Sequence, residues 1–212
     1  MYRQVPNLIT LGRLLLTGLF FAAINRHVGL DGICFWMWLC FALFVLAGLS
    51  DILDGYLARS WKVESAFGRV VDPFADKILI CGAFIFFSSR NFLDPHLLLL
   101  AQTDTVTKVT GVAPWMAVVL VAREFLITGI RGLAESRGID FRAQWAGKIK
   151  MLAQSIAVGA VLGSLATSFR RGGFHPVMWI VITRDIFIWL TLGATVASAL
   201  EYVHRARRIM EA

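Results

Sequence analysis

The sequence has little of what would build a polar surface or a disulfide framework. Of its 212 residues, 17% are charged, and there are three cysteines, five prolines and three tyrosines. Cys34, Cys40 and Cys81 cannot pair evenly and lack the spacing of metal ligands, so we expect them to be small buried hydrophobes. No internal repeat or low-complexity tract is present, and we expect one domain over residues 1–212.

Apolar sequence is what the chain has in excess. Hydrophobic residues make up 58% of it, with a mean hydropathy of +0.69, whereas soluble domains have roughly 45–50% apolar residues. A membrane span needs roughly 20 mainly apolar residues. Six stretches qualify and predict an all-α bundle of six transmembrane helices: 8–26, 33–58, 71–89, 114–134, 145–168 and 177–203. The long connection 88–113 is expected to be a loop, because it contains Pro95 and Gly111.

The basic residues predict the orientation of the bundle. The formal charge is +7, and Lys and Arg concentrate in short cytoplasmic loops. With the N-terminus inside, the inner segments hold nine of these residues and the outer loops five. We therefore expect an integral membrane protein with both termini in the cytoplasm. Arg13 interrupts the first apolar run, which argues against a signal peptide.

Four aspartates lie at the edges of two apolar segments. Asp51 and Asp54 are three residues apart, and Asp72 and Asp76 are four apart, so each pair shares a helix face. The first pair closes the second span and the second pair opens the third. The short link between the spans predicts antiparallel neighbouring helices, with all four carboxylates at one depth near the cytoplasmic interface.

Carboxylates that converge in this way need protons or a cation. Oxygen-rich sites suit Mg²⁺, Mn²⁺ or Ca²⁺, and two divalent ions would balance four negative charges. A pair of metal ions typically clamps a phosphoryl group. Ionisable groups inside a membrane are by default functional, so the sequence predicts a metal-dependent site at these aspartates.

The spacing of these residues forms a pattern, D-x2-D-G-x2-A-R-x8-G-x3-D-x3-D. Its fixed positions are Asp51, Asp54, Gly55, Ala58, Arg59, Gly68, Asp72 and Asp76. The pattern resembles the signature of the CDP-alcohol phosphatidyltransferase family at every position. The resemblance extends over the whole chain, because that family also has six membrane helices and cytoplasmic termini.

The resemblance implies an enzyme that displaces CMP from a CDP-linked lipid, usually CDP-diacylglycerol, with an alcohol as the nucleophile. Asp51, Asp54 and Asp72 would bind the metal, most simply two Mg²⁺ or Mn²⁺ ions. Asp76 would help to hold the metal and act as the general base. The CDP group would be bound by Asp51, Gly55, Ala58, Arg59 and Gly68. A homodimer in the bacterial cytoplasmic membrane is also implied, and no feature predicts a nucleic-acid partner.

The acceptor alcohol is argued from cations elsewhere in the chain. Arg123 and Arg131 lie eight residues apart on the fourth predicted span, and Lys148 and Lys150 lie in the fifth. These four cations would form a phosphate-sized anion site, unless Glu124 pairs with one of them. We expect them to bind the acceptor, together with Thr10 of the first span.

The same segments resemble the bacterial phosphatidylglycerophosphate synthase branch of the family. Its R-E-x-x-I-x-x-x-R and G-K-x-K-T-x-x-Q patterns are matched here except that Met151 replaces the threonine. The implied acceptor is sn-glycerol 3-phosphate. Inositol phosphate or phosphatidylglycerol is the alternative within the family. Outside it, a cation or proton-coupled transporter is the alternative, although no inverted repeat is evident.

Two further charged positions lie within predicted spans. Arg13 shares a helix face with Asn7 and Thr10 and needs an anionic partner or a path to the interface. Arg184 and Asp185 are adjacent and are therefore expected to point in different directions. They would pair between helices or line the site.

Overall fold

The computed structural model describes residues 5–26, 30–61, 66–89, 95–103, 105–137, 145–170 and 173–210. Within these ranges the chain is helical apart from one two-stranded turn. The long helices are α1 Val5–Ile24, α2 Leu30–Trp61, α3 Ala66–Ser88, α6 Pro114–Ser136, α7 Trp145–Ser168 and α8 Met178–Met210. The short elements are helices α4 Pro95–Leu100 and α5 Val106–Thr110 and strands β1 Phe169–Arg170 and β2 Gly173–Phe174.

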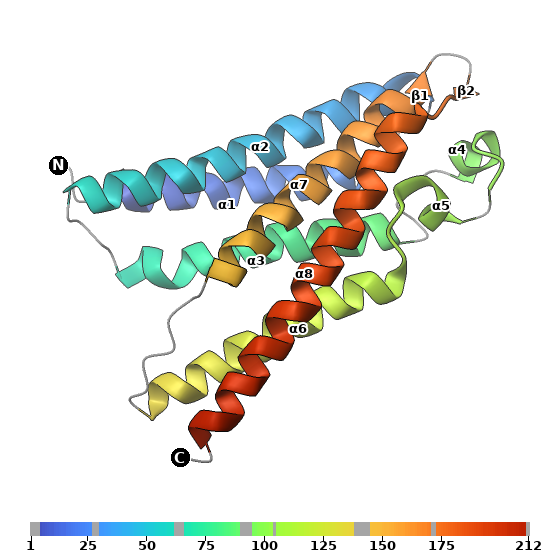
Figure 1. The fold of residues 1–212 in the computed structure, drawn as a ribbon. Coiled ribbons are helices and arrows are strands. Elements are labelled where there is room, and N and C mark those ends of the chain that lie inside the picture. Colours follow the sequence, from blue (N-terminus) through green and yellow to red (C-terminus); the bar gives the residue numbers. More distant parts are fainter. Residues whose placement is uncertain are drawn as a thin grey trace.

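The long helices lie side by side in one elongated bundle, with both termini at the same end (Figure 1). We call this the terminal end. The α4 and α5 helices and the β1–β2 turn lie at the opposite end, which we call the far end. In the described part of the chain α1 packs against both α2 and α3, α7 packs against α2 and α8, and α6 packs against α3 and α8.

The apolar core lies toward the far end of the bundle. Each long helix contributes residues spaced three or four apart, which share one face. On α7 this stripe contains Val158, Val161, Leu162 and Leu165, all at most 1% exposed. They belong to the same cluster as Phe84 and Phe87 of α3, so apolar burial holds the far end together. The buried charged residues Arg13, Arg123, Glu124 and Lys150 lie nearer the terminal end.

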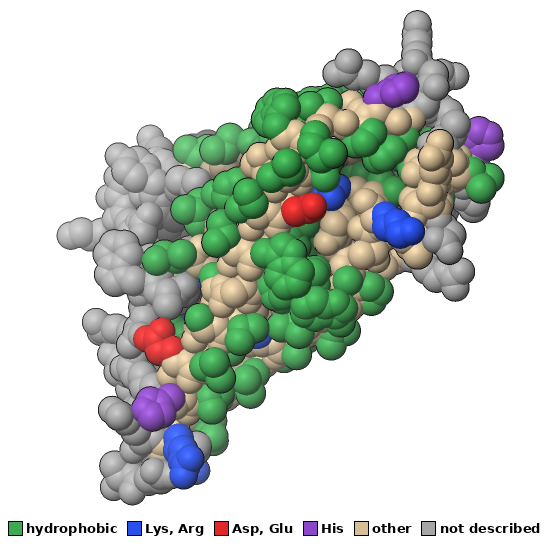
Figure 2. Space-filling model, turned by 45° about the vertical axis from the view of Figure 1, so that its right-hand side comes forward, with side chains coloured by type: hydrophobic (Ala, Val, Ile, Leu, Met, Phe, Trp, Pro, Cys, Tyr) green, Lys and Arg blue, Asp and Glu red, His purple; other side chains and the backbone are tan. Residues whose placement is uncertain are grey.

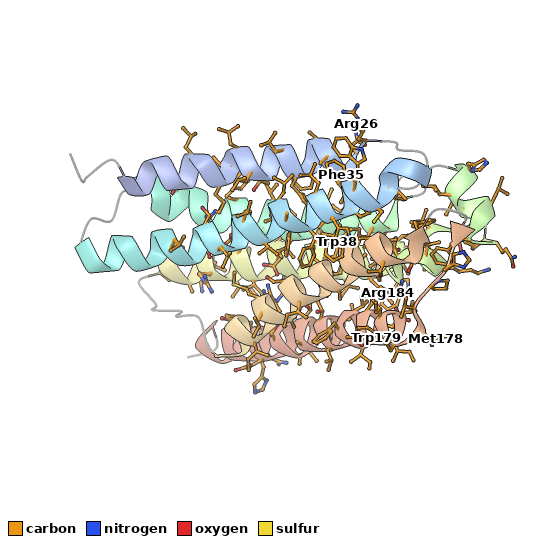
Figure 3. All side chains as sticks on the ribbon, turned by 90° about the horizontal axis from the view of Figure 1, so that it is seen from above. Arg26, Phe35, Trp38, Met178, Trp179 and Arg184 are labelled. Carbon is orange, nitrogen blue, oxygen red and sulfur yellow. The ribbon has the colours of Figure 1, made fainter. Side chains whose placement is uncertain are left out.

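The outer surface of the bundle is apolar, as expected for a protein in lipid. Hydrophobic side chains spread along the length of the face in Figure 2. Phe35 and Trp38 on α2 and Met178 and Trp179 at the start of α8 are all exposed (Figure 3). Aromatic side chains near span ends are typical interfacial anchors.

Three described helices are long and apolar enough to cross a membrane: Gly32–Asp51, Ile149–Ser168 and Met178–His204. The first helix has a shorter apolar stretch, Thr10–Ile24. Within the described residues α3 and α6 are not among these helices, although the sequence predicted spans there. Both helices have charged residues within their apolar runs, among them Asp76 in α3 and Arg123 and Glu124 in α6.

Residues 88–113 differ from the predicted loop, because they include the short helices α4 and α5. The Thr110 hydroxyl donates hydrogen bonds to the carbonyl oxygens of Phe87 and Val106, at 2.9 and 3.1 Å. It therefore ties α5 to the end of α3. Gly111 ends α5 with a φ of 78°, a left-handed conformation that glycine adopts readily.

Candidate active site

A buried arginine joins two of the predicted aspartates. Arg13 of α1 is 1% exposed and forms an ion pair with Asp51 of α2. Its Nη1 atom also lies 3.8 Å from Oδ1 of Asp76 on α3. The side chains of Asp51 and Asp76 are 39% and 24% exposed, so both carboxylates remain accessible from the surface.

The sequence predicted that the second and third spans are antiparallel neighbours in direct contact, and the structure differs in the contact. The helices α2 and α3 are antiparallel, as predicted (Figure 1). They make little direct contact in the described part of the chain, and α1 packs against both. The two helices thus approach each other through Arg13, whose guanidinium can donate to more than one carboxylate.

The remaining motif residues lie on the same two helices. Asp54, Gly55, Ala58 and Arg59 lie in the last turns of α2, and Gly68 and Asp72 lie in the first turns of α3. Their side chains are outside the described part of the structure. The chain therefore brings the backbones of the motif to the terminal end, and the predicted roles of these six residues stay predictions.

The carboxylates of Asp51 and Asp76 are the described part of the predicted metal site. Among the described side chains, no group of three His, Cys, Asp or Glu residues is close enough to hold a metal ion. The side chains of Asp54 and Asp72 lie outside this described set. What the structure does show is that carboxylates of Asp51 and Asp76 approach a single cationic group from two helices. A hard divalent cation prefers such oxygen donors, so the described half of the quartet fits it.

A second buried charge cluster lies deeper in the bundle, where α6, α7 and α8 meet. The carboxylate of Glu124 forms ion pairs with Lys150 and, at 3.3 Å, with Nη1 of Arg123. Arg123 also donates to the hydroxyl of Ser198 from Nη2, at 2.9 Å. All four residues are at most 9% exposed. We call Arg123, Glu124, Lys150 and Ser198 the charged layer.

The charged layer places two of the predicted acceptor-binding residues and modifies their role. The sequence left open whether Glu124 pairs with one of the cations, and in the structure it pairs with both Arg123 and Lys150. Two cations and one carboxylate leave a net positive charge there. Arg131 lies on the same helix two turns nearer the terminal end and is partly buried. Lys148 lies two residues before Lys150 on α7, and its side chain is outside the described part.

Two further residues, Lys77 and Thr10, lie close to Asp76 and Arg13 along their helices. The Nζ atom of Lys77, which follows Asp76, lies 2.5 Å from the hydroxyl of Thr128 on α6. Glu124 is one helical turn from Thr128, toward the far end. Thr10 of α1 is 2% exposed and lies one turn before Arg13. Of the predicted acceptor residues, Arg123 and Lys150 therefore lie about one helical turn from the level of Thr128, toward the far end.

Arg184 and Asp185 do not line this site. Their side chains pair with each other, with the Arg184 Nε atom donating to Oδ1 of Asp185 at 2.8 Å. The expectation that they point in different directions was wrong, because the long arginine side chain folds back to its neighbour. Arg184 also donates from Nη1 to the carbonyl of Val109 in α5, at 2.5 Å. The pair therefore joins α8 to α5 at the far end (Figure 3).

Several polar contacts of the site have no clear sequence signal. Ser198 and Thr128 lie outside every motif, and a hydroxyl in a membrane helix is common. Arg13 did have a signal, since a cation inside an apolar run needs a partner. Its partners could be identified only when three helices had been placed together.

Comparison with known proteins agrees with the motif and the geometry. The sequence profile of the CDP-alcohol phosphatidyltransferase family matches residues 3–197. The CDP-diacylglycerol–glycerol-3-phosphate 3-phosphatidyltransferase of Bacillus subtilis is 31% identical over 210 residues, covering 94% of this chain and 93% of that protein. A probable phosphatidylglycerophosphate synthase of Mycobacterium tuberculosis is 30% identical, covering 97% and 82%.

A third relative, from Cereibacter sphaeroides, is also named CDP-diacylglycerol–glycerol-3-phosphate 3-phosphatidyltransferase. It is 28% identical over 233 residues, covering 96% of this chain and 95% of that protein. The similarity thus extends over nearly the full length of all three relatives, and the family profile covers most of the chain. The chain belongs to the CDP-alcohol phosphatidyltransferase family and is a phosphatidyltransferase enzyme.

Proposed function

We propose that this enzyme transfers a phosphatidyl group from CDP-diacylglycerol to sn-glycerol 3-phosphate. The products are CMP and phosphatidylglycerophosphate. The observation that carries the proposal is the convergence of Asp51 and Asp76, from two helices, on the buried Arg13. The names of the Bacillus subtilis and Cereibacter sphaeroides relatives support the choice of both substrates.

Asp51, Asp54, Asp72 and Asp76 would hold the divalent metal, two Mg²⁺ or Mn²⁺ ions in the simplest arrangement. When bound, the metal polarises the pyrophosphate and stabilises the leaving CMP. The ion pair with the buried Arg13 orients the carboxylate of Asp51. Such outer contacts normally orient ligating carboxylates and tune their metal affinity.

Asp76 is the proposed general base. Its carboxylate is partly exposed. The next residue, Lys77, contacts Thr128 of α6, so Asp76 lies at about the height of Thr128 along the bundle. An acceptor hydroxyl beside Asp76 can give its proton to this carboxylate as the oxygen attacks phosphorus. The CDP group would be held by Gly55, Ala58, Arg59, Gly68 and Asp51, where small side chains let a ligand approach the helix.

The acceptor phosphate would be bound by the cations below and beside Asp76. Arg123 and Lys150 supply a net positive charge despite their pairing with Glu124. Arg131, Lys148 and Thr10 complete the proposed set. A dianionic phosphomonoester needs several such charges, whereas the phosphodiester of phosphatidylglycerol carries a single negative charge. This favours glycerol 3-phosphate or inositol phosphate over phosphatidylglycerol, and the relatives' names favour glycerol 3-phosphate.

We also propose how the enzyme is placed in its membrane. Residues 1–212 form a single domain with six spans in the bacterial cytoplasmic membrane, and the aspartates face the cytoplasm. The three apolar helices support membrane insertion. The common end of the two termini supports an even number of crossings (Figure 1).

The first test is CMP release from CDP-diacylglycerol in detergent, with Mg²⁺ or Mn²⁺ present. Glycerol 3-phosphate, inositol phosphate and phosphatidylglycerol are offered in parallel. We expect release with glycerol 3-phosphate alone, reduced to background in Asp72→Asn because a metal ligand is lost. Glu201→Gln, an exposed carboxylate change on α8, is the matched control and should stay active. Release with only another acceptor would overturn the substrate assignment.

A further inference from the structure

Three buried polar side chains below the charged layer lack hydrogen-bond partners. Among the described residues, the Nε2 atom of Gln154 and the hydroxyls of Thr191 and Thr195 are buried without a donor or acceptor in contact. The three side chains are at most 2% exposed. Buried polar groups in folded proteins nearly always have a partner, so three unpartnered groups on two adjacent helices indicate a polar ligand.

Contacts within the charged layer show where these groups lie. Lys150 of α7 pairs with Glu124, and α7 runs antiparallel to α6 (Figure 1). Gln154, one turn beyond Lys150, is therefore level with Leu120. Ser198 of α8 bonds to Arg123, and α8 runs in the same direction as α6. Thr195, three residues before Ser198, is also level with Leu120.

Gln154 and Thr195 thus lie at the same height along the bundle. They are one helical turn nearer the far end than Arg123 and Lys150, on the side away from Asp51 and Asp76. Asp76 is adjacent to Lys77, which contacts Thr128. From Thr128 to Leu120 is eight residues of α6, or about 12 Å at 1.5 Å per residue. A three-carbon phosphate ester, with a hydrogen bond of about 2.8 Å at each end, spans a comparable distance.

We propose that Gln154 and Thr195 donate hydrogen bonds to the phosphate of the acceptor, at the inner end of its site. This rests on the proposed function, and it adds two neutral residues to Arg123 and Lys150, the two assigned cations that lie one turn from them. The acceptor hydroxyl points to Asp76, and its phosphate lies between the charged layer and the Gln154–Thr195 layer. Thr191, one turn nearer the far end on α8, is the innermost of the three unpartnered side chains.

Neutral donors suit this place for an electrostatic reason. Glu124 already takes up part of the charge of Arg123 and Lys150, so a phosphate here depends on additional hydrogen bonds as well as on charge. The amide of Gln154 and the hydroxyl of Thr195 can each donate to a phosphate oxygen. Neither adds another cation that would have to be buried without a partner.

The test uses the full-length enzyme and three single variants. Thr195→Val removes one hydroxyl and keeps the shape of the side chain, and Gln154→Leu removes the amide. Ser164→Ala is the matched control, because Ser164 is 1% exposed and its hydroxyl donates to the carbonyl of Val161 in its own helix. The measurements are KM for both substrates, kcat, the inhibition constant of inorganic phosphate, and thermal unfolding.

We expect Thr195→Val and Gln154→Leu each to raise KM for glycerol 3-phosphate about tenfold or more, as for lost hydrogen bonds to a charged group. The inhibition constant of inorganic phosphate should rise in proportion. The KM for CDP-diacylglycerol should not change, and Ser164→Ala should match the wild type. Unchanged phosphate inhibition in Thr195→Val would overturn the inference and assign these groups to buried water or packing.

Failure of the proposed function gives a different result. In that case the wild type does not release CMP with glycerol 3-phosphate, and the inference is tested by binding alone. Inorganic phosphate should then raise the unfolding temperature of the wild type and of Ser164→Ala, but less that of Thr195→Val. A wild type that phosphate does not stabilise would overturn the inference. Thr195→Val suffices for this comparison if Gln154→Leu does not fold.

Discussion

At the scale of single residues, Arg13 shows how a charge is kept inside an apolar bundle. An isolated buried guanidinium would be very costly, and Arg13 is 1% exposed. Its cost is offset by the ion pair with Asp51 and by the nearby carboxylate of Asp76. The same contacts hold two carboxylates that would otherwise repel each other, so the residue that needs an anion also orders the proposed metal ligands.

We predict that Arg13→Met lowers the affinity for Mn²⁺ by about 10–100-fold, the usual effect of losing an outer-sphere contact to metal ligands. Free Mn²⁺ can be followed by electron paramagnetic resonance during titration of the purified protein. The unfolding temperature should fall as well, since the carboxylates lose their partner. Arg13→Lys should recover part of the affinity.

Arg26→Met is the control for this prediction, because Arg26 is exposed at the far end and stacks on Trp36. It removes the same charge without touching the aspartates. Removal of a nearby cation would by itself favour metal binding. If Arg13→Met binds Mn²⁺ as well as the wild type or better, repulsion dominates and the orienting role is wrong.

At the scale of elements, the short helix α5 is fixed at the far end by contacts from two long helices. Thr110 bonds to the last turn of α3, and Arg184 of α8 bonds to the carbonyl of Val109. Gly111 lies where these contacts meet. A Cβ atom there would be 2.7 Å from Oδ1 of Asp185 and 2.9 Å from Nε of Arg184.

We predict that Gly111→Ala destabilises the protein by at least about 1–2 kcal/mol, the cost of a left-handed conformation for a residue with a side chain. The contact with the Arg184–Asp185 pair adds to this. Thermal unfolding in detergent measures the change. Activity below the unfolding temperature should be retained, because the motif aspartates Asp51 to Asp76 lie at the terminal end of the bundle, away from Gly111.

Gly163→Ala is the matched control, since a Cβ at this position in α7 meets nothing within 4 Å. Replacing a helical glycine by alanine should leave stability unchanged or raise it. Equal stability of Gly111→Ala and Gly163→Ala would show that the junction of α5 and α8 tolerates a side chain. The strain argument would then be wrong.

At the scale of the whole molecule, polarity is distributed along the long axis. The terminal end carries the aspartates and both chain ends, and the far end carries the apolar core and the β1–β2 turn (Figure 1). A polar path runs from Asp76 through the charged layer toward Gln154 and Thr195. In the proposed function, a water-soluble acceptor would therefore reach the aspartates from the terminal end.

We predict that the terminal end faces the cytoplasm. In a background with alanine at Cys34, Cys40 and Cys81, His175→Cys should react with a membrane-impermeant maleimide added to intact spheroplasts. Arg207→Cys should react only after permeabilisation. Both side chains are exposed, one after β2 and one near the end of α8. The opposite labelling pattern would reverse the orientation inferred from the basic residues.

The sequence by itself determined the helices and the motif. Apolar runs located the long helices within a few residues at most ends, because burial and membrane insertion both depend on composition over many residues. The spacing of Asp51 through Asp76 indicated the family, since it places the functional groups on helix faces whatever their neighbours are. It could not predict the short helices α4 and α5, because α5 is held by contacts with α3 and α8 and α4 packs against β2.

Only the tertiary structure decided which charges meet. Arg13 pairs with Asp51 rather than reaching the interface, and Glu124 contacts Arg123 and Lys150 together. These pairings depend on how each helix is rotated and at what height it packs, and many weak apolar contacts set both. A sequence pattern fixes positions along one helix, whereas an ion pair between helices depends on the relative placement of two.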